Sequence, residues 1–159
     1  MRGAAVTIAR GVAARLLCRL ALVLLWSGSA EAAHCTIATT SVSFGSYDVF
    51  ASTPTDTTGT VSVTCTGNAD VTITLSKGGS SSFNPRTLNG GTDTLKYNLY
   101  KDAARTTIWG DGTGSTATYT QLGVPNNTAQ NLTIYGRIPA AQDVRAGTYT
   151  DSITVTIDF

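Results

Sequence analysis

Apolar and polar residues alternate over the last eleven positions of the chain, YTDSITVTIDF. The apolar residues of one parity are Tyr149, Ile153, Val155, Ile157 and Phe159. The other parity is polar throughout, and Asp151 is the one polar residue that shares the apolar parity. An apolar residue at every second position is typical of a strand that buries one face. The pattern therefore predicts a closing β-strand that turns these apolar side chains inward.

The same alternation recurs upstream in short runs that are separated by turn residues. The runs lie at residues 35–37, 42–44, 61–65, 71–75, 95–99, 117–124 and 132–138, and a further short strand ends at Trp109. Segments 51–59 and 80–93 are rich in turn-forming residues and are expected to be loops. Residues 68–70 predict a tight connection that joins runs 61–65 and 71–75 as a hairpin. Seven or eight short strands of this kind predict an all-β, immunoglobulin-like β-sandwich.

The first 32 residues differ in composition from the rest of the chain. Four arginines precede or flank an apolar run at residues 20–26, and Ala30-Glu31-Ala32 matches an A-x-A cleavage site. This order is typical of a secretory signal peptide, and the apolar run is short for a membrane-spanning helix. The sequence predicts a signal peptide over residues 1–32 and one exported domain over residues 33–159. No later stretch is apolar enough to span a membrane, so no span is expected after signal removal.

The charge of the exported part argues against nucleic acid as a partner. Four of the eleven Lys and Arg residues lie in the leader, so seven remain against nine Asp in residues 33–159. The exported part therefore has a net charge of about −2. Binding to nucleic acid requires a basic surface, which this balance does not provide.

Two cysteines remain beyond the leader, Cys35 and Cys65. An even pair in an exported protein predicts a disulfide, which would contribute roughly 3–4 kcal/mol by restricting the unfolded chain. A metal site would need more ligands than this pair and His34 provide. Both cysteines are in phase with apolar neighbours, so we expect the bridge to connect two core-facing positions.

Few residues suggest catalysis. His34 is the one histidine and lies beside the expected mature terminus, where chains fray. No serine occurs in a G-x-S-x-G context, and the aspartates lie among Gly, Asn and Thr, where turns account for them. Asp111, the strongest candidate for an acid or a calcium ligand, has such a context in WGDGTG. The sequence predicts no enzyme, no cofactor and no metal.

Two segments, YNLYKDAARTTIWGDG at residues 97–112 and GTYTDSITVTIDF at residues 147–159, resemble the signature segments of the spore coat protein U domain family. The runs CTIATTSVSFGSYDVF and GTVSVTCT fit the N-terminal half of that family. The resemblance covers essentially all of residues 33–159. Members of the family are secreted bacterial proteins, and many are subunits of archaic chaperone–usher pili.

The resemblance implies an immunoglobulin-like sandwich that is incomplete because it lacks its last strand. A periplasmic chaperone supplies the missing strand first, and the N-terminal extension of another pilin subunit later replaces it, which is β-strand complementation. The residues that would line the accepting groove are Ile153, Val155, Ile157 and Phe159. The implied partners are the chaperone, an outer-membrane usher and other pilin subunits. The implied location is the periplasm in transit and then the cell surface, in a pilus or a coat.

The expected exported chain departs from this pattern at its start. Donating a strand requires a free extension of about five residues or more, but only Ala33 and His34 would precede Cys35. The sequence thus predicts a subunit that accepts a strand without donating one, and hence a tip subunit with an adhesive role. Alternatives are a complete sandwich with an ordinary edge strand, a surface or spore-coat matrix protein, and a free-standing secreted adhesin that binds a glycan or a surface.

Overall fold

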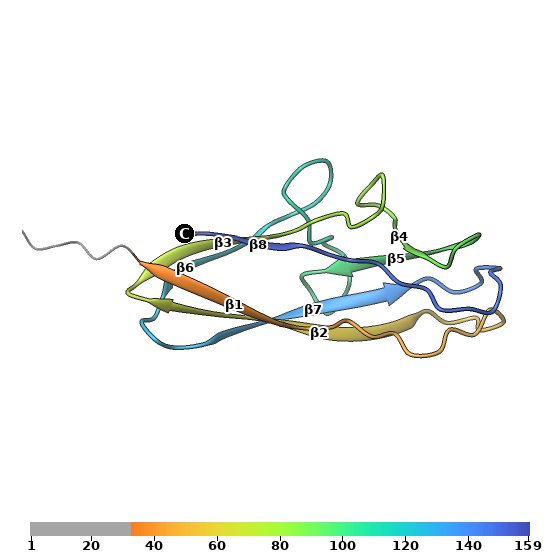
Figure 1. The fold of residues 1–159 in the computed structure, drawn as a ribbon, viewed down its shortest axis with the longest axis horizontal. Coiled ribbons are helices and arrows are strands. Elements are labelled where there is room, and N and C mark those ends of the chain that lie inside the picture. The colour runs from red at the N-terminus through yellow and green to blue at the C-terminus, as the bar shows by residue number, and fades with distance from the viewer. Residues whose placement is uncertain (1–32) are drawn as a thin grey trace, which may run out of the picture. The chain divides into compact units, whose positions relative to one another are not determined.

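The computed structural model describes residues 33–159, which form eight strands in two sheets (Figure 1). The strands are β1 (His34–Thr40), β2 (Thr55–Thr66), β3 (Ala69–Leu75), β4 (Arg86–Asn89), β5 (Thr94–Tyr100), β6 (Tyr119–Val124), β7 (Gln130–Ile138) and β8 (Val155–Asp158). One sheet has the order β1-β2-β7-β5-β4 and the other β6-β3-β8, with antiparallel strand pairs throughout. The signal peptide expected over residues 1–32 lies outside the described residues. No helix within residues 33–159 has the length and hydropathy to cross a membrane.

The core between the two sheets is built from the alternating positions that the sequence shows. Six inward residues of β2 and β3 are at most 1% exposed, and they are Val61, Val63, Cys65, Val71, Ile73 and Leu75. Trp109 is fully buried, and its indole N–H donates a hydrogen bond of 3.1 Å to the carbonyl of Ile73. The prediction of an all-β, immunoglobulin-like sandwich is confirmed.

The predicted hairpin between residues 61–65 and 71–75 is wrong. β2 pairs with β1 and β7, whereas β3 lies in the other sheet between β6 and β8. The chain changes sheets near Gly67, whose φ of 85° is a conformation that glycine adopts without strain. Both strands bury one face, and alternation alone does not distinguish pairing within one sheet from packing across the core.

Two segments that the sequence predicts as loops contain strand. Residues 55–59 extend β2 and pair with β7, and β4 lies inside segment 80–93 and pairs with β5. A side chain at Gly59 would place its Cβ 2.7 Å from Cγ2 of Val42, so glycine here permits close packing rather than a turn. Pairing with strands distant in the sequence overrides the local composition in both segments.

The predicted disulfide between Cys35 and Cys65 is confirmed. The two residues face each other in the register of β1 and β2, with their Cα atoms 4.0 Å apart. Because 30 residues separate them in the sequence, the bridge contributes about 3–4 kcal/mol through the unfolded state. It also fixes the start of β1 to the sheet.

Candidate functional site

The first and last strands each leave one edge without a partner strand within residues 33–159. β1 pairs only with β2, and β8 pairs only with β3. These two edges belong to different sheets (Figure 1). Residues at the end of β1 and at the start of β8 line one cavity, so the two edges lie on the same side of the sandwich. Unpaired backbone N–H and C=O groups along an edge are available to pair with another strand.

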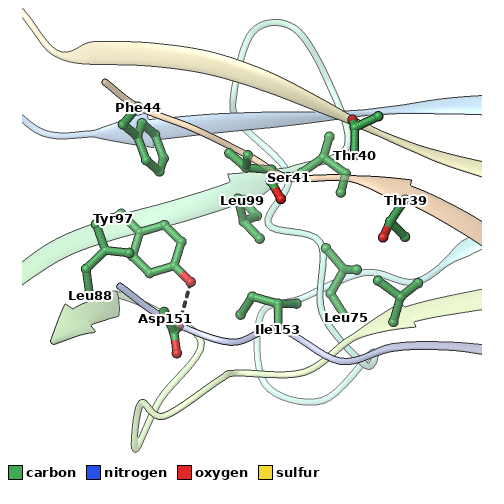
Figure 2. Close-up of a pocket in the computed structure, with 13 residues that line it drawn as sticks. Thr39, Thr40, Ser41, Phe44, Leu75, Leu88, Tyr97, Leu99, Asp151 and Ile153 are labelled. Carbon is green, nitrogen blue, oxygen red and sulfur yellow. Dashed lines mark hydrogen bonds between the residues drawn. The ribbon is translucent and has the colours of Figure 1, made fainter. Parts of the chain in front are cut away.

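The cavity between the two edges has a volume of about 240 Å³, and we call it the edge groove (Figure 2). Residues 39–42 form one side, and residues 151, 153 and 155 form the other. The remaining lining residues are Phe44, Leu75, Leu88, Tyr97, Leu99 and Ile134. Three of them, Leu75, Tyr97 and Leu99, are at most 3% exposed, so the floor of the groove is the core of the sandwich.

The four residues predicted to line a groove lie in three different settings. Ile153 and Val155 are half-buried and line the edge groove. Ile157 is also half-buried and faces Ile73 in the register of β8 and β3. Phe159 lies beyond the end of β8 and is 57% exposed. The structure therefore brings Ile153 and Val155 together at the cavity and leaves the other two outside its lining.

The segment before β8 is held in place by hydrogen bonds to Asn89, at the end of β4, and to Ser76, just after β3. Thr150 and Asn89 exchange N–H···O bonds of 2.8 and 3.0 Å. The Ser76 N–H donates to the carbonyl of Thr154, and the Thr154 N–H donates to the Ser76 hydroxyl, both at 2.9 Å. The strand predicted over residues 149–159 is thus β8 with an extended lead-in. These bonds fix one edge of the lead-in, while its side chains at 151 and 153 line the groove.

Asp151 is the one charged side chain that lines the edge groove. The hydroxyl of Tyr97 donates to Asp151 Oδ2 at 2.6 Å (Figure 2). The N–H groups of Gly79 and Ser152 donate to Oδ1 at 2.9 and 2.8 Å. Burial and the bond to Asp151 raise the pKa of Tyr97, so the phenol remains protonated and keeps donating. A side chain at Gly78 would collide with the Asp151 carboxylate, which explains the glycine.

Arg86, the register partner of Tyr97, is fully buried. Its Nε and Nη2 donate to the carbonyl of Ser76 at 3.1 and 2.9 Å. Nη2 also donates to the carbonyl of Trp109 at 2.7 Å, and Nη1 donates to Asn98 Oδ1 at 2.9 Å. Burial lowers the pKa of Arg86, and Tyr97 and the Asp151 carboxylate oppose that shift. The sequence placed Arg86 in a loop and gave no signal of this role.

Asp111, the sequence candidate for an acid or a calcium ligand, lies in a turn of the described part of the chain. Asp111 accepts hydrogen bonds from the N–H and the hydroxyl of Thr113 at 2.9 and 2.6 Å, as in a turn. Among residues 33–159, no group of three or more His, Cys, Asp or Glu side chains lies close enough to hold a metal ion. The edge groove instead offers apolar contacts and two backbone edges, which suit a bound extended chain.

Comparison with solved structures shows a similar fold in a pilus assembly complex. One chain of the CsuC–CsuE chaperone–tip adhesion subunit pre-assembly complex, from the archaic chaperone–usher Csu pili of Acinetobacter baumannii, matches with a TM-score of 0.59. The two chains are 26% identical, and the match covers 80% of this chain and 40% of that chain. The likeness supports the sandwich fold over most of the present chain.

Comparison of sequences gives the family. Protein U of Myxococcus xanthus is 37% identical over 110 residues, which cover 64% of this chain and 59% of Protein U. The chain therefore spans well under two thirds of the length of both proteins to which it is compared. Residues 22–156 match the Spore Coat Protein U domain, which confirms the resemblance seen in the signature segments. This chain belongs to the Spore Coat Protein U domain family.

Proposed function

We propose that this chain is a structural subunit of a chaperone–usher surface fibre, and that its edge groove accepts a strand from a partner polypeptide. One observation carries the proposal: the unpaired edges of β1 and β8 flank a cavity whose floor is the core of the sandwich. A strand between these edges would pair its backbone with both of them and bury alternate side chains on the floor. Family membership and the likeness to a chaperone–tip adhesion subunit complex support this role.

The physical cost of an empty groove explains the need for a chaperone. An open edge beside half-buried apolar side chains such as Ile153 and Val155 favours association with other chains. Each large aliphatic side chain that an incoming strand buries contributes about 1.5–3 kcal/mol. A periplasmic chaperone that fills the groove would protect the subunit until an outer-membrane usher exchanges the chaperone for another subunit. The subunit would thus pass through the periplasm and end at the cell surface.

The proposal predicts that the exported chain depends on one periplasmic partner. The full chain with an affinity tag, purified from the periplasm of its host, should carry a single chaperone in a one-to-one complex identified by mass spectrometry. Depletion of that chaperone should leave the subunit aggregated or degraded. Soluble, folded subunit at normal yield in the depleted cells would contradict strand complementation.

A finer proposal places the subunit at the fibre tip, with an adhesive role. The likeness to a chaperone–tip adhesion subunit complex supports it. The disulfide also ties Cys35 into the sheet, so residues from this position onward are not free to serve as a donor strand. The subunit purified with its chaperone should remain a one-to-one complex at high concentration in size-exclusion chromatography and should form no chains of subunits. Homopolymers held together by its own N-terminal residues would contradict the tip position.

A coat or matrix protein is the second candidate, and the match to the Spore Coat Protein U domain favours it. Such a protein would use the same groove for association, but its assembly would form a layer around the cell or spore. Immunogold labelling distinguishes the two, because a fibre subunit is found on thin filaments and a tip subunit at their ends. An even layer without filaments would favour the coat.

A further inference from the structure

The edge groove presents three side chains of one strand parity in a row, Asp151, Ile153 and Val155. Positions two residues apart in an extended chain lie on the same face, so these three side chains follow each other along the groove. A strand that lies beside them would oppose them with its own alternate side chains. Two of the three positions favour apolar partners, whereas the third is a carboxylate.

The Asp151 carboxylate has neutral hydrogen-bond donors and no cationic partner in the described part of the chain. Its three donors are the N–H groups of Gly79 and Ser152 and the hydroxyl of Tyr97. The ion pairs within residues 33–159 both involve Asp56 instead. Oδ2 accepts only the Tyr97 hydroxyl, and a carboxylate oxygen has room for a further donor.

The charge of Arg86 interacts with Asp151, but the hydrogen bonds of Arg86 are directed elsewhere. The guanidinium donates to the carbonyls of Ser76 and Trp109 and to the side chain of Asn98. The Arg86 charge therefore acts on Asp151 through space and leaves the carboxylate without a direct ionic contact. While the groove is open, Asp151 is half-buried and keeps contact with water.

Closing the groove with a strand would remove that water. A carboxylate that loses its water without gaining a cation is costly to bury, whereas a charge-assisted hydrogen bond offsets the loss. Resting on the proposed function of the groove, we infer that the partner strand carries a lysine or arginine opposite Asp151. Its sequence then has a basic residue two positions from the apolar residue opposite Ile153 and four positions from the one opposite Val155. Asp151 sets the register and the choice of partner.

Synthetic strand-length peptides test this inference on the full exported chain. The peptides alternate valine, which faces the groove, with threonine. One position, two residues beyond the last valine, carries lysine, norleucine or glutamate. Each peptide is made in two versions, with this position at the N-terminal or the C-terminal end, because the direction of the bound strand is not fixed in advance. Norleucine keeps the aliphatic length of lysine and removes only the ammonium group. The matched protein variants are Asp151→Asn and, as a control with the same change of charge, Asp158→Asn on the exposed parity.

The lysine peptide should bind the unmodified chain about tenfold or more tightly than the norleucine peptide, and glutamate should bind weakest. The difference between lysine and norleucine should vanish in Asp151→Asn and persist in Asp158→Asn. Equal or tighter binding of norleucine to the unmodified chain would overturn the inference, even if Asp151→Asn does not fold. If the norleucine peptide binds and lysine gives no gain in affinity, the groove still accepts a strand, and only the role of Asp151 is rejected. If no peptide binds, the proposed function itself fails.

Discussion

Ile153→Asp and Val155→Asp are each expected to abolish capture of the subunit by its strand-donating partner. Both side chains line the edge groove, so either change places a carboxylate where the partner strand must pack. A charge in an apolar contact costs several kcal/mol unless it is neutralised or escapes to water. A cost of that size lowers affinity by about 100-fold or more. Quantitative co-purification of the chaperone with each tagged variant measures the effect.

The matched controls are Thr154→Asp and Thr156→Asp, which add the same charge one residue away on the exposed parity. Because these side chains point to solvent, the affinity of both control variants for the chaperone should remain within a few-fold of that of the unmodified chain. Phe159→Asp should also have a small effect, since Phe159 is already 57% exposed. Equal losses at both parities would show that the groove lies elsewhere.

The inward faces of the strands could be predicted from the sequence because alternation encodes them directly. Leu95, Tyr97 and Leu99 are in phase in the sequence and are at most 3% exposed in β5. Burial alternates in the same way along the closing strand, where residues 153, 155 and 157 are half-buried and their neighbours are exposed. Each of these assignments depends on one residue and its immediate neighbours, which is information that a single sequence contains.

The pairing of strands could not be predicted in the same way. β2 and β3 are adjacent in the sequence and both bury one face, yet they lie in different sheets. β2 instead pairs with β7, and the register joins Thr55 to Ile138. Such a choice depends on how the sheets twist and on which edges remain open after the core has formed. Alternation within each strand carries no information about either.

The polar contacts of the site could not be predicted from the sequence for a related reason. Asp151 broke an apolar pattern, which was a signal, but its partner Tyr97 lies 54 residues earlier in the chain. Tyr97 itself fitted the core pattern without any sign of a polar contact. Arg86 lies in a segment rich in Ser, Asn and Gly, and this composition predicts a loop although the segment contains β4. Contacts of this kind become visible only when the fold places the segments side by side.

The buried Arg86 supports the groove wall through Ser76. Ser76 lies between this arginine and the lead-in to β8: its carbonyl accepts from Arg86, while its N–H and hydroxyl bond to Thr154. A change at Arg86 therefore affects the position of residues 153 and 155 through one intermediate residue. It also removes the donor for the carbonyl of Trp109 and one of the two donors for Asn98 Oδ1, which keeps the Leu99 N–H.

Arg86→Met should destabilise the folded subunit by about 2–6 kcal/mol, because it leaves the carbonyls of Ser76 and Trp109 without their Arg86 donors, at roughly 1–3 kcal/mol each. Arg145→Met is the matched control, since Arg145 is exposed and its side chain bonds only to the hydroxyl of Thr92. Urea unfolding with the disulfide intact measures both variants. Trp109 is the single tryptophan of residues 33–159, so its fluorescence reports the core directly. Chaperone capture should fall together with stability in Arg86→Met and stay unchanged in Arg145→Met. Equal unfolding midpoints for the two variants would mean that the network around Arg86 does not hold the groove wall.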